Sequence, residues 1–179
     1  MNNKKKLQKI RILVIDIVIM GVLIGLDQFT KYLAVIHLKD KPAYKIINGI
    51  LELNYLENRG AAFGMLQNQI VFFIFVEVIV LSVIAYILYK TPIHKKYNRM
   101  HMLLSLIAAG AIGNMIDRIR LDYVVDFIYI VLINFPIFNL ADIYVSFSTV
   151  ILVLALLFYY KEEDLYFISF NQKKIREIR

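Results

Sequence analysis

Four long apolar stretches constrain what this 179-residue chain can fold into. They cover residues 12–36, 70–89, 100–119 and 140–160. A helix of about 20 mostly apolar residues crosses the roughly 30 Å hydrocarbon core of a bilayer, so each stretch is long enough to span it. With 60% hydrophobic residues, the chain is also too apolar for a water-soluble domain. We therefore expect one polytopic membrane domain over residues 1–179, an all-α protein with four transmembrane helices.

The basic residues gather on one side of these stretches. They precede the first stretch, fill the link between the second and third, and follow the fourth: Lys4, Lys5, Lys6, Lys9, Arg11; Lys90, Lys95, Lys96, Arg99; Lys161, Lys173, Lys174, Arg176 and Arg179. The positive-inside rule then places both termini, including a tail over residues 161–179, in the cytoplasm. The formal net charge of +7 is explained by contact with anionic membrane lipids, and no nucleic-acid partner is expected.

Residues 37–69 and 120–139 are then the two segments on the outer face. The first reads "YKIINGILELNYLENRGAAFG", in which apolar and polar residues alternate on both sides of Asn48–Gly49. Alternation around an Asn-Gly pair is typical of a β-hairpin. We expect a small β-element over residues 43–64, ending in a glycine-containing turn at residues 60–64. The second segment is shorter and is interrupted by Pro136.

Metal chemistry and thiol chemistry have no support in this sequence. The chain has no cysteine, and its three histidines, His37, His94 and His101, stand far apart. Zinc sites need Cys or His residues at short, regular spacings. We expect no metal and no cofactor.

Three polar clusters interrupt the apolar stretches. They are Asp27 and Lys31 in "DQFTK"; Asn114, Asp117 and Arg118 in "GNMIDR"; and Asn139 and Asp142 in "FNLAD". Within each cluster the spacing is i, i+3 or i, i+4, which places the side chains on one face of a helix. The predicted topology puts all three clusters in the outer half of the membrane. We therefore expect them to converge on one site.

Several of these residues also have purely structural interpretations. Asp27 and Lys31 can form an intramembrane ion pair that only fixes helix packing, and Asp117 and Arg118 can pair at the membrane interface. Asp142 can be a favourable charge at the positive end of a helix. Asp126, in "VVDF", has apolar neighbours and no adjacent base, so a structural role is harder to find for it.

Carboxylate chemistry remains as the reaction that these residues can perform. Two aspartates in a site of low dielectric do not both ionise easily, so one keeps its proton near neutral pH. The ionised carboxylate can act as a general base on water and the protonated one can donate to a carbonyl oxygen. Asp126 and Asp142 are the pair we select. A proton-coupled transporter is the alternative, but the polar residues occupy only the outer half and no internal repeat is present.

The ordered motifs "DQFTK", "NRGAAFG", "GNMIDR", "VVDF" and "FNLAD" resemble the signal peptidase II family, the lipoprotein signal peptidases. The resemblance covers residues 25–148. It implies an aspartic endopeptidase of the bacterial cytoplasmic (inner) membrane, with its active site toward the extracytoplasmic face. Such an enzyme removes signal peptides from prolipoproteins and cuts before a cysteine that carries diacylglycerol.

The resemblance also implies roles for individual residues. Asp126 and Asp142 correspond to the catalytic dyad, and the remaining matches are substrate-binding or dyad-supporting residues: Asn58, Asn114, Arg118, Asn139, Asp27 and Lys31. The outer β-element corresponds to a β-cradle, and residues 120–138 to a short outer helix or flap. The implied partners are lipidated prolipoproteins and membrane lipids, and the chain is expected to act as a monomer.

Overall fold

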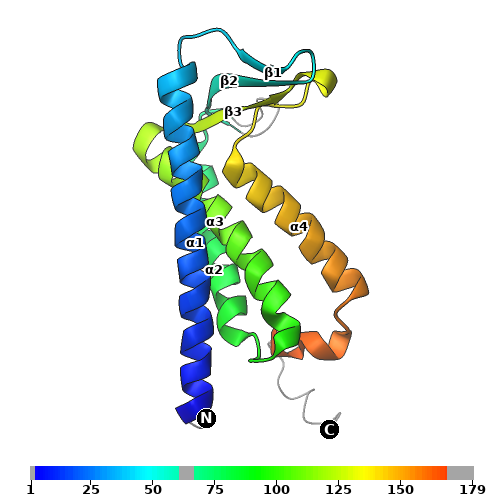
Figure 1. Cartoon of the computed structure of the whole chain (residues 1–179). Helices are drawn as coiled ribbons and strands as arrows, with labels where there is room; N and C mark the ends of the chain where they lie inside the picture. The colour runs from blue at the N-terminus through cyan, green and yellow to red at the C-terminus, as the bar shows by residue number, and fades with distance from the viewer. Residues whose placement is uncertain (1–2, 61–66, 169–179) are drawn as a thin grey trace.

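The fold, given by a computed structural model that describes residues 3–60 and 67–168, is a bundle of helices with a small sheet across one end (Figure 1). Its main elements are α1 (Asn3–Leu38), β1 (Tyr44–Ile47), β2 (Leu51–Asn58), α2 (Ile70–Lys90), α3 (Asn98–Leu121), β3 (Val124–Ile130) and α4 (Leu140–Phe158). Three 3₁₀ turns accompany them: η2 (Lys95–Tyr97), η3 (Val131–Ile133) and η4 (Glu162–Ile168). Most of the predicted turn at residues 60–64, and the chain after residue 168, lie outside the described residues.

Long apolar helices dominate the described part of the chain, as predicted. Three helical segments have the length and composition needed to cross a bilayer: Ile70–Lys90, Lys95–Leu121 and Leu140–Phe158. They correspond to the second, third and fourth predicted spans. Helix α1 has 36 residues and is not among these three.

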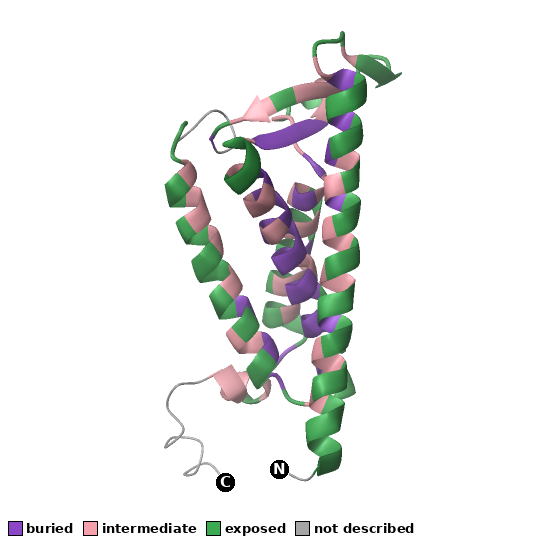
Figure 2. Ribbon diagram, turned by 90° about the vertical axis from the view of Figure 1, so that its left-hand side faces the viewer, coloured by how far each residue is buried: buried purple, intermediate pink, exposed green. Residues whose placement is uncertain are grey.

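Helix α3 is the central, most buried helix of the bundle (Figure 2). Its middle is rich in small residues, which allow neighbouring helices to approach closely. A Cβ atom added to Gly110 would lie 2.5 Å from the backbone oxygen of Ala141, on α4. One added to Gly113 would lie 2.5 Å from Oδ2 of Asp27, on α1. The two glycines therefore set how closely α4 and α1 pack on α3.

The predicted hairpin is present, and a third strand joins it. Strands β1 and β2 pair antiparallel, and Gly49 in their turn has φ of +72°, which glycine adopts easily. Strand β3 pairs antiparallel with β2 and completes a sheet of order β1-β2-β3. Residues 120–138 were expected to form a short outer helix or flap; this segment contains the strand β3, and the helical part that follows β3 is the three-residue turn η3. The sequence "VVDFIYI" is rich in β-branched and aromatic residues, which favour a strand.

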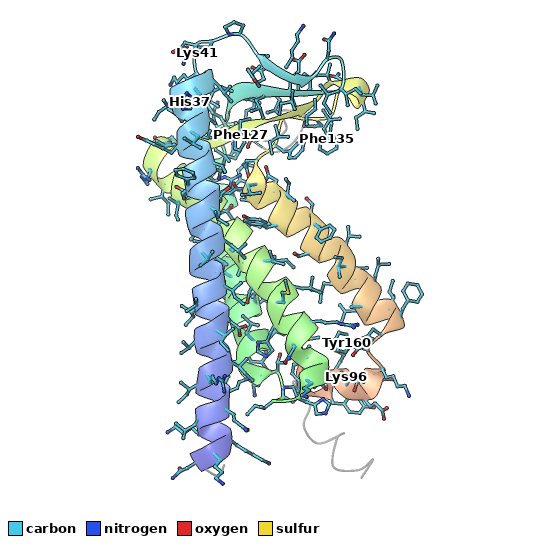
Figure 3. The ribbon with its side chains drawn as sticks, viewed as in Figure 1. His37, Lys41, Lys96, Phe127, Phe135 and Tyr160 are labelled. Atoms are coloured by element: carbon cyan, nitrogen blue, oxygen red, sulfur yellow. The ribbon has the colours of Figure 1, made fainter. Side chains whose placement is uncertain are left out.

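The sheet is attached to the end of α1 through an apolar cluster. Ala34 and Leu38 of α1 pack against Val125 and Phe127 of β3, and all four side chains are buried. Figure 3 places Phe127 beside the upper part of α1. This contact fixes β3, and with it Asp126 between the two core residues, relative to the helices.

The other end of the bundle is closed by aromatic rings and one ion pair. The ring of Tyr97 stacks on that of Tyr160 and meets Phe167 of η4 edge to face. The Tyr160 hydroxyl donates a hydrogen bond to the backbone oxygen of Lys96, and the Lys96 ammonium pairs with Asp164 (Figure 3). These contacts connect the α2–α3 link to the end of α4.

A buried polar contact joins α1 to α3 in the half of the bundle away from the sheet. Oδ2 of Asp16, on α1, lies 2.7 Å from Nδ1 of His101, on α3. Both side chains are buried. The interface between α1 and α3 therefore contains polar side chains at two positions along α1, Asp16 and Asp27.

We predict that Gly110→Ala lowers the stability of the purified protein by about 1–3 kcal/mol, because the new methyl group would overlap the Ala141 backbone and the α3–α4 contact would have to open. Thermal unfolding in detergent measures this change. Gly25→Ala is the matched control, since a Cβ atom there meets nothing within 4 Å. It should leave the unfolding midpoint unchanged or raise it. Equal midpoints for the two variants would show that the close α3–α4 approach contributes nothing.

Candidate active site

A buried lysine lies at the centre of the polar residues that the sequence predicts to converge. The Lys31 ammonium of α1 is 2.8 Å from Oδ1 of Asn114, 2.9 Å from Oδ2 of Asp27 and 3.0 Å from Oδ2 of Asp117. The residue is 3% exposed. An ammonium group has three N–H donors, so each has an acceptor oxygen. Lys31 thus connects α1 to α3 without an unsatisfied donor.

The two carboxylates bound by Lys31 also accept backbone N–H groups from other elements. Oδ1 of Asp27 lies 3.0 Å from the backbone nitrogen of Ala141, in the first turn of α4. Oδ2 of Asp117 lies 3.1 Å from the backbone nitrogen of Val125, in β3. Each of these nitrogens belongs to the residue immediately before one aspartate of the predicted dyad. The ion pairs of Lys31 therefore fix the backbone on which both dyad residues lie.

Asp126 of β3 is 1% exposed and is held by two side-chain amides. Nδ2 of Asn139 donates to its Oδ1 at 2.7 Å, and Nδ2 of Asn58 donates to its Oδ2 at 2.8 Å. Burial raises the pKa of Asp126 to about 7, and the negative charge of Asp142 contributes in the same direction. The two amide hydrogen bonds oppose this shift but do not cancel it. At neutral pH the Asp126 carboxyl therefore holds its proton for a large share of the time.

Asp142 lies in the first turn of α4 and is fixed by a capping box with Asn139. The Asn139 side-chain oxygen accepts the Asp142 backbone N–H at 3.0 Å, and the Asn139 backbone N–H donates to Oδ2 of Asp142 at 3.1 Å. Nδ2 of Asn114 donates to the other carboxylate oxygen at 2.8 Å. Because Asn139 also binds Asp126, one residue joins the two carboxylates.

A cavity of about 880 Å³ lies beside these carboxylates, between the sheet and the helices. Four of the predicted site residues are on its wall: Asp126, Asp142, Asn58 and Arg118. The other four, Lys31, Asp27, Asn114 and Asn139, are buried and do not line it. The wall is completed by Asn54, Leu56, Glu57, Arg59, Gly60, Gln67, Tyr129, Asn134, Phe135, Pro136, Ile137, Phe138 and Ser146. The eight predicted residues thus form one connected site, in which four residues line the cavity and four are buried behind them.

Three residues with polar contacts in this site were not among the predicted site residues. Asp117 belongs to one of the clusters expected to converge, but it was given no role beyond an interfacial pair with Arg118; in the structure it binds Lys31 and the backbone of Val125. Gln28 donates to Oδ1 of Asp117 at 2.9 Å, and Glu77 of α2 pairs with Arg118. Asp117 could have been selected as a site residue because it shares a helix face with Asn114. Glu77 could have been selected because it is an isolated charge in an apolar stretch.

The arrangement provides acids, amides and cations but no cluster of metal ligands. Across residues 3–60 and 67–168, no three His, Asp or Glu side chains are grouped in a way that could hold a metal ion. What the site can do chemically is to exchange protons through two carboxylates next to a cavity large enough for an extended peptide segment.

Comparison with known proteins gives a consistent result. Residues 19–158 match the family model described as Signal peptidase (SPase) II. A lipoprotein signal peptidase of Caldanaerobacter subterraneus subsp. tengcongensis is 47% identical over 143 residues, which cover 79% of this chain and 95% of that protein. The lipoprotein signal peptidase of Enterococcus faecalis is 46% identical over 132 residues, covering 74% of this chain and 81% of that protein.

Two solved structures, each described as a bacterial membrane enzyme, have the same fold. The first has a TM-score of 0.72 and 32% identity and covers 82% of this chain and 92% of its own. The second has a TM-score of 0.70 and 33% identity, with coverages of 81% and 94%. From the family match, the sequence identities and these folds together, we conclude that this chain belongs to the signal peptidase II family and is a peptidase.

Proposed function

We propose that this peptidase removes the signal peptide from bacterial prolipoproteins, cutting before a diacylglyceryl-modified cysteine, with Asp126 and Asp142 as its catalytic dyad. One observation carries the proposal: two aspartates from different elements, joined by Asn139, lie on the wall of one cavity. The names of the relatives, lipoprotein signal peptidases, supply the substrate class.

In the proposed reaction, Asp142 is the ionised member of the dyad and Asp126 the protonated one. Asp142 takes a proton from a water molecule, whose oxygen attacks the carbonyl carbon of the scissile bond. Asp126 donates its proton to the carbonyl oxygen, which gives a neutral tetrahedral intermediate. Asp142 then returns its proton to the leaving nitrogen as the C–N bond breaks, and Asp126 regains a proton from the collapsing hydroxyl group. The dyad ends in its starting state.

The different surroundings of the two carboxylates support this assignment. The pKa of Asp126, raised to about 7 by burial, suits a general acid at neutral pH. Asp142 accepts a backbone N–H and a side-chain amide N–H, one on each oxygen, and both favour a negative charge. The first-turn position in α4 adds the positive end of a helix dipole.

The amides and the cations have supporting roles in the proposal. Asn58, Asn114 and Asn139 orient the dyad through their N–H groups. Arg118, on the cavity wall, is placed to bind backbone carbonyl oxygens of the substrate. Lys31 and Asp27, together with Asp117, hold the backbone beneath the dyad.

The proposed orientation follows from the charge distribution and from the surface of α1. We propose that α1 is the first of four spans, because large apolar side chains along it are exposed, among them Ile17, Val22 and Phe29. Residues 1–179 would then form one domain of the cytoplasmic membrane, with both termini in the cytoplasm and the dyad toward the extracytoplasmic face. We further propose that the chain acts as a monomer.

We predict that Asp126→Asn and Asp142→Asn each reduce cleavage of a lipidated precursor peptide by about 10²–10⁴-fold or more, since an amide keeps the shape but cannot exchange a proton. The mass loss of the peptide, followed with purified protein, measures this. Asp122→Asn is the control, because Asp122 caps α3 in a left-handed conformation that asparagine tolerates. Near-normal turnover in either dyad variant would remove that residue from the mechanism.

A second prediction concerns the lipid on the substrate: a precursor with an unmodified cysteine should be cleaved far more slowly than its diacylglyceryl form. Each buried CH₂ adds about 0.8 kcal/mol to membrane anchoring, so two acyl chains hold the cysteine at a fixed depth. A fixed depth aligns the scissile bond with the dyad, and a misplacement of about 1 Å can slow a reaction by about 10²-fold. Matched peptides should be compared at equal density in proteoliposomes. Equal rates would mean that the lipid is not recognised.

A further inference from the structure

Glu77 is the single charged residue in the apolar stretch at residues 70–89. Helix α2, which contains it, is otherwise a highly apolar candidate span. An ionisable side chain in such a helix is costly to insert and therefore indicates a functional role. Neither the dyad nor its amide ligands in the proposed mechanism contact Glu77, so its presence calls for a separate explanation.

Glu77 and one other residue of α2 hold the same guanidinium group. Oε1 of Glu77 is 2.6 Å from Nη1 of Arg118, and the two side chains are 15% and 12% exposed. The Arg118 guanidinium also lies over the ring of Phe73, 4.9 Å from the ring centroid. Phe73 precedes Glu77 by four residues, so both lie on one face of α2. Helix α2 therefore binds the Arg118 side chain through the ion pair with Glu77 and the cation–π contact with Phe73.

Arg118 faces the same cavity as the two dyad carboxylates. Its ion pair with Glu77 uses one of five guanidinium N–H donors. Among residues 3–60 and 67–168, no other group accepts a hydrogen bond from Arg118. Within the described part of the chain, the remaining donors are therefore available to a ligand in the cavity.

The positive charge of Arg118 must be paired with a carboxylate outside the dyad if the dyad carboxylates are to stay unpaired with it. The charged and titratable groups around the dyad are Asp27 and Lys31 on α1, Glu77 on α2, Asp117 and Arg118 on α3, Glu57 and Tyr129 on the sheet, and Arg59 directly after β2. Of the carboxylates, Glu77 is the one paired with Arg118, and Asp117 is already held by Lys31. Without Glu77, the carboxylates next available to Arg118 are on the cavity wall, and they include the dyad.

We propose that Glu77 is a positioning residue for the cleavage reaction: with Phe73, it holds the Arg118 guanidinium at the cavity wall, ready for substrate carbonyl oxygens and away from the dyad. This inference rests on the proposed function, because it assigns a role within the same site. Glu77 acts through Arg118 and does not itself contact the reacting atoms.

The test compares Glu77→Gln with the wild-type protein over a range of pH, using the lipidated precursor peptide. Glutamine keeps the shape but leaves the charge of Arg118 uncompensated, and a nearby positive charge favours ionised carboxylates. The alkaline limb of the pH–rate profile, where Asp126 loses its proton, should therefore move to lower pH by about 0.5–1 unit. At neutral pH, kcat/KM should fall about tenfold, the equivalent of one lost hydrogen bond to a charged group. Ser82→Ala, on the same helix, should change neither quantity, since among the described residues the Ser82 hydroxyl donates to its own helix backbone, at Val78.

A double-variant comparison isolates the action through Arg118. Arg118→Gln alone should lower kcat/KM, and adding Glu77→Gln to it should cause no further loss, because the group that Glu77 positions is already gone. If Glu77→Gln does not accumulate in the membrane, Phe73→Leu serves instead, as it keeps both charges. It should raise KM about threefold, in line with the loss of one cation–π contact, and leave the pH–rate profile in place.

The inference is overturned if Glu77→Gln keeps the wild-type pH–rate profile, or if its effect adds fully to that of Arg118→Gln. An unchanged KM in Phe73→Leu would count equally against it when that variant replaces Glu77→Gln. Failure of the proposed function is a different result: the wild-type protein would then not cleave the lipidated peptide, or Asp126→Asn would cleave it normally.

Discussion

The ammonium group of Lys31 is the contact on which the rest of the site depends. It lies in the bundle interior, where an uncompensated charge would be strongly unfavourable, and it is stabilised there by oxygens of Asp27, Asp117 and Asn114. These partners are useful because of what else they bind. Asp27 accepts the N–H of Ala141, Asp117 accepts that of Val125, and Asn114 donates to a dyad carboxylate. One cation on α1 thereby determines where α4 begins and where β3 lies. The glycine at position 113 allows this, since any side chain there would collide with Asp27.

The two dyad aspartates come from elements with different constraints, and the structure brings them together through asparagine. Asp126 is held in a strand whose register pairs it with Leu56 of β2, so Asn58, two residues further along β2, lies on the same face and reaches Asp126 with its amide. Asp142 is held by the capping box of α4. Asn139 belongs to both arrangements, because its side-chain amide donates to Oδ1 of Asp126 while its backbone N–H and side-chain oxygen hold Asp142. A shift of α4 relative to β3 would therefore break both sets of contacts. The close packing of α4 on α3 at Gly110 holds the first turn of α4 next to α3.

The sequence predicted the second, third and fourth apolar helices and the hairpin because their signals are local. Apolar length identifies α2, α3 and α4, and alternation around Asn48–Gly49 identifies β1 and β2. It did not predict β3, because residues 124–130 pair with a strand about 70 residues earlier and the resemblance pointed to a short outer helix or flap there. Helix spacing explains why Asp27, Lys31 and Asn114 were selected. The partners of Asp16, Asp117 and Glu77 could not be found in this way, since each contact joins two helices whose relative rotation is set by tertiary packing. Asp126 and Asp142 were selected on chemical grounds, and the structure places them on one cavity wall; their catalytic role stays a prediction.

The most direct test of this account is the rate at which a Lys31→Met variant cleaves the lipidated precursor peptide, measured well below its own unfolding temperature. Methionine fills a similar volume but provides no donor for the three oxygens. If Lys31 fixes the backbone beneath the dyad, the folded variant should lose activity by about 10²-fold or more, because dyad groups displaced by about 1 Å no longer align with the substrate. A folded Lys31→Met protein that cleaves at close to the wild-type rate would contradict the account, since the dyad would then be positioned without the ammonium group.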